Sequence, residues 1–102
     1  MPSPSDGASD GGQRIARRVV AHGHVQGVFY RAACQREAES RGVAGWVRNR
    51  TDGAVEALFE GPVGAVRQLV DWASSGPRRA VVERSEVDEV DPSGLTRFEV
   101  RD

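Results

Sequence analysis

Glycine-containing turns cut this chain into short segments, and the period of the apolar residues changes from one segment to the next. Alternation and β-branched residues predict strands over 15–22, 43–49, 54–60, 80–90 and 96–101. A helical period predicts one helix over 28–41 and a second from Gly61-Pro62 to the stop signal Ser75-Gly76-Pro77. The order of these segments leaves few folds open to the chain.

Two local patterns support this division. In the first predicted helix, Tyr30, Cys34 and Ala38 are spaced at i, i+4 and i+8, so they fall on one stripe. Between the second and third predicted strands, Asp52-Gly53 is a strong signal for a tight turn. The patterns predict a helix with one buried stripe and, after residue 43, a β-hairpin.

The order strand-helix-strand-strand-helix-strand, followed by a short extra strand, is the split βαβ or ferredoxin-like pattern. It predicts an α+β sandwich in which two helices pack on one face of an antiparallel sheet.

The length of 102 residues is that of one domain. Residues 1–13 are mostly Ser, Gly, Asp, Pro and Ala, and such a composition offers too little apolar surface to offset the entropy of ordering. We expect a disordered N-terminal tail over 1–13 and one folded domain over 14–102. The tail lacks the apolar run and the basic start of a signal peptide.

The charge balance argues against several classes of function. Fourteen arginines, with no lysine, oppose 15 acidic residues, and the formal net charge is −1. This balance disfavours a protein that coats nucleic acid or a polybasic membrane anchor. No apolar run approaches the ~20 residues of a membrane-spanning helix. The single cysteine, Cys34, cannot form an internal disulfide, so we expect a cytoplasmic protein with no nucleic-acid or membrane partner.

The first strand-to-helix turn is the best candidate for an anion site. Its glycines allow a tight turn that presents successive N–H groups, and a helix N-terminus adds partial positive charge. Arg31, in the first helical turns, can hold two phosphate oxygens at once. The alternative is an ordinary glycine turn beside a surface arginine, and spacing alone leaves both open. The candidate residues are Gly23, His24, Val25, Gln26, Gly27, Val28 and Arg31.

A second candidate is Asn49, at the end of the second predicted strand. Its carboxamide can donate and accept hydrogen bonds, so it can orient a water molecule. The alternative is that Asn49 merely starts the turn, where asparagine is common, and residue type alone favours that alternative. Trp46, among strand residues, is expected in the core.

Other reactive residue types have simpler interpretations. His22 and His24 are expected to be an exposed pair rather than a metal site, and no Asp, Glu or His cluster has metal-ligand spacing. Cys34 lies on the helix stripe and is expected to be a small buried residue, not a nucleophile. An acidic run is expected to form a solvated strand edge: Glu83, Glu86, Asp88, Glu89 and Asp91.

Together, the two candidate segments resemble the two signatures of the acylphosphatase family. The first resemblance is carried by Gly23, Val25-Gln26-Gly27-Val28 and Tyr30-Arg31. The second is carried by Gly45-Trp46-Val47-Arg48-Asn49, followed by Gly53, Val55 and Gly61 at the family spacing. Gly61-Pro62, Trp72 and Gly76-Pro77 also resemble bacterial members. The similarity covers about residues 15–101.

The resemblance implies the ferredoxin-like fold and an acylphosphatase that hydrolyses the carboxyl-phosphate anhydride of acyl phosphates. It implies that Arg31 and the N–H groups of Gly23–Val28 bind the phosphate. Asn49 would orient the attacking water, with Thr51 as a possible auxiliary residue. No metal or cofactor is expected, inorganic phosphate or sulfate should compete, and we expect a monomer.

Two other classes of function stay open. The first is a binding module that holds an anion without turnover, as in similar domains fused into larger carbamoyl-transfer proteins. The presence of both Arg31 and Asn49 argues against it. The second is single-stranded RNA binding on the open sheet, which needs a basic face and stacking aromatics that this composition does not favour. The physiological acyl phosphate is not specified by the sequence.

Overall fold

The computed structural model describes residues 13–102, so nearly all of the predicted N-terminal tail lies outside the described residues. The seven predicted elements are present, with boundaries shifted by one to a few residues. They are β1 (Arg14–His24), α2 (Tyr30–Ser40), β2 (Ala44–Asn49), β3 (Val55–Pro62), α3 (Val63–Ala73), β4 (Val81–Val90) and β5 (Phe98–Arg101).

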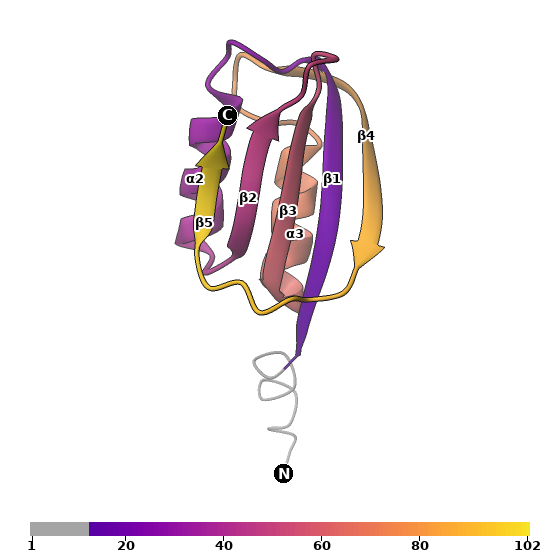
Figure 1. The fold of residues 1–102 in the computed structure, drawn as a ribbon. Helices are drawn as coiled ribbons and strands as arrows, with labels where there is room; N and C mark the ends of the chain where they lie inside the picture. The colour runs from indigo at the N-terminus through magenta and orange to yellow at the C-terminus, as the bar shows by residue number, and fades with distance from the viewer. Residues whose placement is uncertain (1–12) are drawn as a thin grey trace.

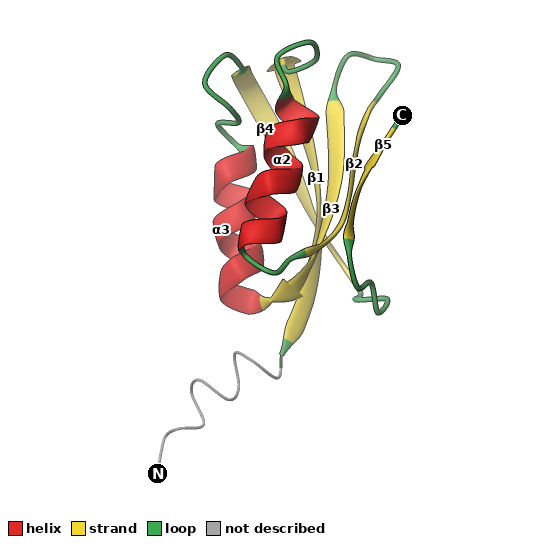
Figure 2. Ribbon diagram, turned by 90° about the vertical axis from the view of Figure 1, so that its left-hand side faces the viewer, coloured by secondary structure: helices red, strands yellow, loops and turns green. Residues whose placement is uncertain are grey.

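The strands form one five-stranded sheet in the order β4-β1-β3-β2-β5. Both helices cover the same face of this sheet and leave the other face open (Figure 1 and Figure 2). The predicted ferredoxin-like α+β sandwich is confirmed. One edge differs from the antiparallel prediction, because β5 pairs with β2 in parallel and the sheet is mixed. The connection after β4 crosses the end of the sheet to the far edge, where β2 and β5 start side by side (Figure 1).

The core lies between the helices and the inner sheet face. The predicted stripe of Tyr30, Cys34 and Ala38 is buried, and Val55 and Phe59 of β3 are buried with it. Burial, followed by the nearby charge of Glu37, raises the pKa of the Cys34 thiol well above its ordinary value. Cys34 is therefore the buried, inert side chain that its position predicts.

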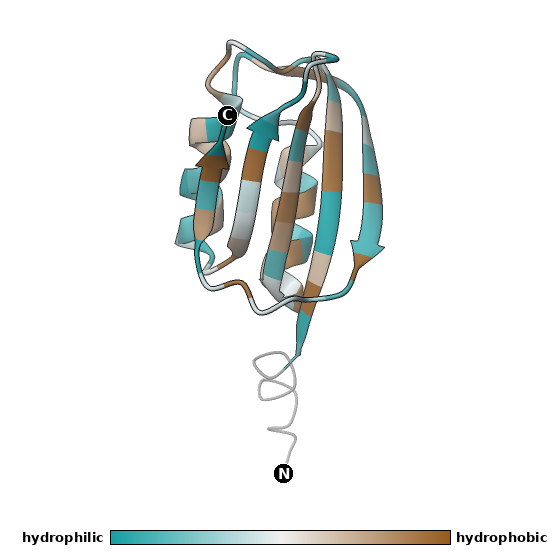
Figure 3. Cartoon of the chain, in the orientation of Figure 1, coloured by the Kyte–Doolittle hydropathy of each residue, from teal (hydrophilic) through white to brown (hydrophobic). Residues whose placement is uncertain are grey.

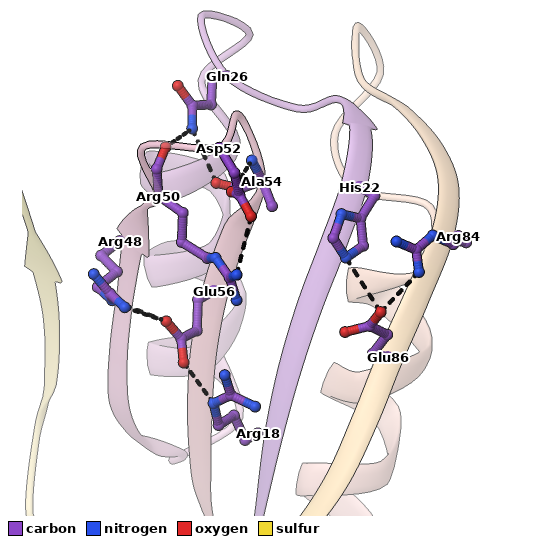
Figure 4. A network of polar contacts seen from close by, with 10 residues as sticks. All are labelled: Arg18, His22, Gln26, Arg48, Arg50, Asp52, Ala54, Glu56, Arg84 and Glu86. Carbon is purple, nitrogen blue, oxygen red and sulfur yellow. Dashed lines mark hydrogen bonds and ion pairs between the residues drawn. The ribbon is translucent and has the colours of Figure 1, made fainter.

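The open face of the sheet carries an ion-pair network in place of an apolar layer. Glu56 on β3 is buried beneath Arg18 of β1 and Arg48 of β2, and Arg48 Nε donates to Glu56 Oε1 at 2.9 Å (Figure 4). The prediction that Trp46 belongs to the core is wrong. Because side chains alternate along a strand, the burial of Val47 turns Trp46 to this open face, where Arg101 lies 5.0 Å from its ring centroid.

Strand β4 is an edge strand whose acidic residues face solvent, as predicted. Glu83, Glu86, Asp88 and Glu89 are exposed, and hydrophilic positions occupy much of this strand (Figure 3). Charged edges of this kind discourage pairing between sheets of different molecules.

At the end of the sheet opposite the hairpin turn, the Glu60 carboxylate holds the connection between β4 and β5. Glu60 is almost completely buried and accepts hydrogen bonds from the backbone N–H groups of Ser93, Gly94 and Leu95, at 3.0, 2.8 and 3.1 Å. Burial alone would raise the pKa of Glu60, but these N–H groups and Arg14 lower it overall. The carboxylate therefore stays ionised inside the fold.

Neither α2 nor α3, each 11 residues long, is long and apolar enough to cross a membrane.

Candidate active site

The connection between β1 and α2 forms one wall of the candidate site. β1 continues to His24, so Gly23 and His24 of the predicted loop pair with Val82 and Val81 of β4. Gly23 has φ +131°, and a Cβ there would lie 2.2 Å from the Val81 carbonyl oxygen, so only glycine fits. The predicted phosphate loop was 23–28, whereas the irregular connection in the structure is residues 25–29.

Two valines fix this loop to the core. Val25 and Val28 are buried, whereas Gly27 between them is exposed and has φ +78°. Within residues 13–102, no carbonyl or side chain accepts a hydrogen bond from the backbone N–H groups of 26–29. The loop is held by its side chains, and its backbone donors remain free to bind an anion.

The helix that follows begins in an unusual way. Phe29, the N-cap residue of α2, has φ 63° and ψ 25°, and it is the one non-glycine residue of 13–102 with positive φ. A left-handed conformation costs a residue with a Cβ about 1–2 kcal/mol. Tyr30, the next residue, is buried and donates from Oη to the Ala73 carbonyl oxygen at 2.6 Å, so the start of α2 is tied to the end of α3.

Arg31 lies in the first turn of α2 and reaches the end of β5. Its Nη1 donates to the Arg101 carbonyl oxygen at 2.7 Å and lies 3.7 Å from Asp102 Oδ1. A guanidinium has five N–H donors, so these contacts leave donors for a ligand. The contact with β5 holds the side chain at one orientation, which lowers the entropic cost of using it.

The opposite wall is the turn of the β2–β3 hairpin. Asn49 is the last residue of β2 and pairs with Val55 of β3. The turn is closed by a hydrogen bond from Arg50 N to the Ala54 carbonyl oxygen at 2.8 Å. Asp52 Oδ1 accepts from the Ala54 N–H at 3.0 Å, and this hydrogen bond lowers the pKa of Asp52. The turn that carries Asn49 is therefore well defined.

The side chain of Gln26 joins the two walls. Its Nε2 donates to the carbonyl oxygens of Arg50 and Ala54 at 2.8 and 2.9 Å, so one carboxamide connects the loop to both sides of the hairpin turn (Figure 4). The sequence does not predict this positioning role, because the acceptors of Gln26 lie 24 and 28 residues away along the chain. The Arg101 carbonyl that holds Arg31 was also missed.

The structure brings the central predicted residues together. Gly27, Arg31 and Asn49 line one hollow of about 470 Å³. The connection from β1 to α2 and the ends of β2 and β5 lie at the same end of the sheet (Figure 1). Thr51 is exposed and lies with Asn49 on an adjoining hollow of about 560 Å³. The volume of the first hollow is within the range of ~300–1,000 Å³ typical of small-molecule sites.

Volume alone would favour a different hollow as the candidate active site. A larger hollow, about 600 Å³, lies at the other end of the sheet between Arg14, Gly42 and the connection to β5. Its neighbouring carboxylate, Glu60, already accepts the backbone N–H groups of that connection. The hollow at Arg31 and Asn49 is the better candidate because it combines a cation, a carboxamide and free backbone donors.

Other predicted residues lie outside this hollow. His24 is exposed, and His22 Nε2 lies 3.5 Å from Glu86 Oε2 without the geometry of a hydrogen bond (Figure 4). Among residues 13–102, no three His, Cys, Asp or Glu side chains are grouped so that they could hold a metal ion.

Comparison with known proteins agrees with this geometry. The sequence profile of the acylphosphatase family matches residues 17–100. An acylphosphatase of Gloeobacter violaceus is 54% identical over 90 residues, which cover 84% of this chain and 97% of that protein. The acylphosphatase structure from Bacillus subtilis has a TM-score of 0.82 at 39% identity, covering 85% of this chain and 98% of that one. The one from Coxiella burnetii also has a TM-score of 0.82, at 32% identity, covering 86% and 93%. The chain belongs to the acylphosphatase family of hydrolases.

Proposed function

We propose that this chain hydrolyses acyl phosphates to a carboxylate and inorganic phosphate in the hollow between the 25–29 loop and Asn49. The observation that carries the proposal is that Gly27, Arg31 and Asn49, from three separate segments, line the same hollow. Membership in the acylphosphatase family supports the reaction type.

In this proposal the phosphate is held by Arg31 and by the loop. The free N–H groups of 26–29 and the guanidinium donate to the phosphoryl oxygens, whose charge they neutralise. Because Arg101 already orients Arg31, the donors are in place before substrate binds. Inorganic phosphate or sulfate should compete, since either offers the same oxygens.

Asn49 acts on the water molecule in this proposal. Its side-chain oxygen accepts a hydrogen bond from water and aims the water oxygen at phosphorus, opposite the acyl oxygen. A bond forms between the water oxygen and phosphorus, and the bond between phosphorus and the acyl oxygen breaks. The carboxylate leaves with the electron pair, and the proton lost by water passes to phosphate or solvent. Thr51, in the same turn, is an auxiliary residue for this water.

The proposed reaction needs no metal and no cofactor. The carboxylate is a good leaving group, so its departure needs no strong acid. Phosphoryl transfer then depends mainly on position and charge stabilisation, which one arginine and preorganised N–H donors supply. We also propose that the protein acts as a monomer, because every residue proposed for the site lies in one chain, and that it is cytoplasmic, since its single cysteine cannot form an internal disulfide.

The test is hydrolysis of benzoyl phosphate by the full chain in the presence of EDTA, with p-nitrophenyl phosphate as a monoester control. We expect turnover of the acyl phosphate and little of the monoester. Loss of activity in EDTA that returns with added zinc or magnesium would contradict the metal-free mechanism. Binding of phosphate without any turnover would identify a binding module instead.

A further inference from the structure

The hollow at Arg31 and Asn49 also has an apolar side that the proposed reaction does not use. Phe29 and Val100 line it, from the N-cap of α2 and from β5. Phe29 is 73% exposed, more than any other large hydrophobic residue of 13–102, and Val100 is 41% exposed. Two solvent-exposed apolar side chains therefore flank the polar groups that would hold the phosphate.

The left-handed backbone at position 29 makes phenylalanine an unusual residue there. Its left-handed conformation favours glycine or asparagine, yet the position holds a bulky aromatic residue. The ring is exposed, so core packing does not explain the choice. Strained residues persist where the surroundings fix them, and they cluster at ligand sites, so this outlier points to a contact with a ligand.

We propose that Phe29 and Val100 form a subsite for the acyl group, and that the chain prefers acyl phosphates with aromatic or branched apolar acyl groups over acetyl phosphate. The inference rests on the proposed function, because it assumes that the phosphate lies at Gly27, Arg31 and Asn49. Besides the small side chain of Ala32, the exposed apolar residues that line the hollow are Phe29 and Val100, so the acyl group can bury apolar surface mainly against these two.

The preference must appear in the transition state as well as in binding. The acyl oxygen is the leaving group, so contacts to the acyl chain persist while the bond to phosphorus breaks. Such contacts raise kcat/KM for substrates that make them, and they do not raise kcat/KM for substrates too small to make them. An acetyl group has only one methyl group with which to reach Phe29.

The experiment compares kcat/KM for benzoyl phosphate and acetyl phosphate in wild type, Phe29→Gly, Phe29→Asn and Phe29→Tyr. Glycine and asparagine suit the left-handed backbone but lack the ring, whereas tyrosine keeps it. We expect the benzoyl-to-acetyl ratio to fall about tenfold in Phe29→Gly and Phe29→Asn, the scale of lost apolar contacts in a pocket. The ratio should persist in Phe29→Tyr, and Val100→Ala should lower it about threefold.

The outcomes separate this inference from the proposed function. If wild type hydrolyses neither substrate, the proposed function fails first. If the wild type hydrolyses both substrates and Phe29→Gly keeps the wild-type ratio, the acyl subsite alone is wrong. If Phe29→Gly and Phe29→Asn lose both activities equally, Phe29 positions the loop and does not select substrates, which also overturns the inference. Melting temperatures confirm that each variant is folded.

Discussion

The two ends of the sheet use backbone N–H groups in opposite ways. At the far end, three successive N–H groups, of Ser93, Gly94 and Leu95, donate to the internal carboxylate of Glu60. At the site end, the N–H groups of 26–29 have no acceptor within residues 13–102. Only the first set of donors is satisfied by an acceptor within the described residues.

We infer that the N–H groups at the far end serve the stability of the fold and that those at the site end serve ligand binding. An anion supplied by the chain fixes the connection to β5 permanently, whereas donors without an internal acceptor can serve an anion from outside. The larger hollow lies at the far end and the smaller one at the site end. Hydrogen-bonding capacity, and not volume, therefore distinguishes the site. Substitutions at the two ends should have different effects.

The largest effect on activity is expected for Arg31→Ala. Without the guanidinium, kcat/KM for benzoyl phosphate should fall about 10³-fold, and phosphate should compete more weakly, since Arg31 holds the phosphate in both the ground and transition states. Arg31→Lys should recover little, because an ammonium cannot replace the planar fork. Arg36→Ala, an exposed arginine on the same helix, is the matched control. Near-normal kinetics in Arg31→Ala would show that the Arg31 end of the sheet is not the active site.

Asn49→Ala should have the next largest effect. We expect kcat to fall about 10²-fold while the inhibition constant of phosphate changes little, as for an interaction made mainly in the transition state. Thr51→Ala, in the same turn, should cost much less. Circular dichroism and melting must show an intact fold, because Asn49 also ends β2. A loss of phosphate affinity as large as that of Arg31→Ala would contradict the separate role on water.

A smaller effect is expected for the side chain of Gln26, which connects the two walls of the site through its carboxamide. Gln26→Glu keeps the shape, but an ionised carboxylate cannot donate to the Arg50 and Ala54 carbonyl oxygens. We expect kcat/KM to fall about tenfold, since small displacements of positioned groups are costly. Gln68→Glu, an exposed position on α3, is the control. Full activity in Gln26→Glu would show that the loop holds its geometry alone.

The smallest effect on activity, and the largest on stability, is expected for Glu60→Gln. Hydrogen bonds to a charged group contribute roughly 1.5–3 kcal/mol, so the free energy of unfolding should fall by about 2 kcal/mol and Tm by about 10 °C. The value of kcat/KM should change less than twofold. Glu89→Gln, on exposed β4, should be nearly neutral. Activity lost in a folded Glu60→Gln protein would mean that the two ends are coupled.

The pH dependence of stability gives a second test of the role of Glu60. The pKa of Glu60 is lower in the folded protein than its ordinary value of 4.5. The stabilisation is therefore fully present above about pH 4.5 and is lost as the pH falls through the lower folded value. Urea unfolding should show the difference in stability between wild type and Glu60→Gln shrinking below that pH. A difference that stays constant would assign the effect to packing.

Patterns within one segment were predicted well from sequence, because they depend on local geometry. The spacing of Tyr30, Cys34 and Ala38 placed one helix face in the core, and Asp52-Gly53 placed the turn of the hairpin between β2 and β3. The error at Trp46 had an available signal, since a buried Val47 implies that its neighbour points the other way. The resemblance of the two signatures supplied Arg31 and Asn49 as site residues.

Contacts between distant segments could not be predicted in the same way. The acceptors of Gln26 lie 24 and 28 residues away, and the carbonyl that holds Arg31 lies 70 residues away. The direction of β5 depends on where the connection from β4 crosses the sheet. None of these contacts leaves a periodic signal, because each requires the finished topology.

Because Cys34 is buried, the rate at which a thiol reagent labels it measures how often the fold opens around α2. The chain holds one cysteine, and its sulfur is inaccessible beneath α2 with a raised pKa, so almost no reactive thiolate is present near neutral pH. A thiol reagent can react only when α2 lifts from the sheet. Because α2 also carries Arg31, the rate of labelling reports directly on how often the phosphate-binding helix departs. A ligand that binds the native site should slow that rate in proportion to its occupancy.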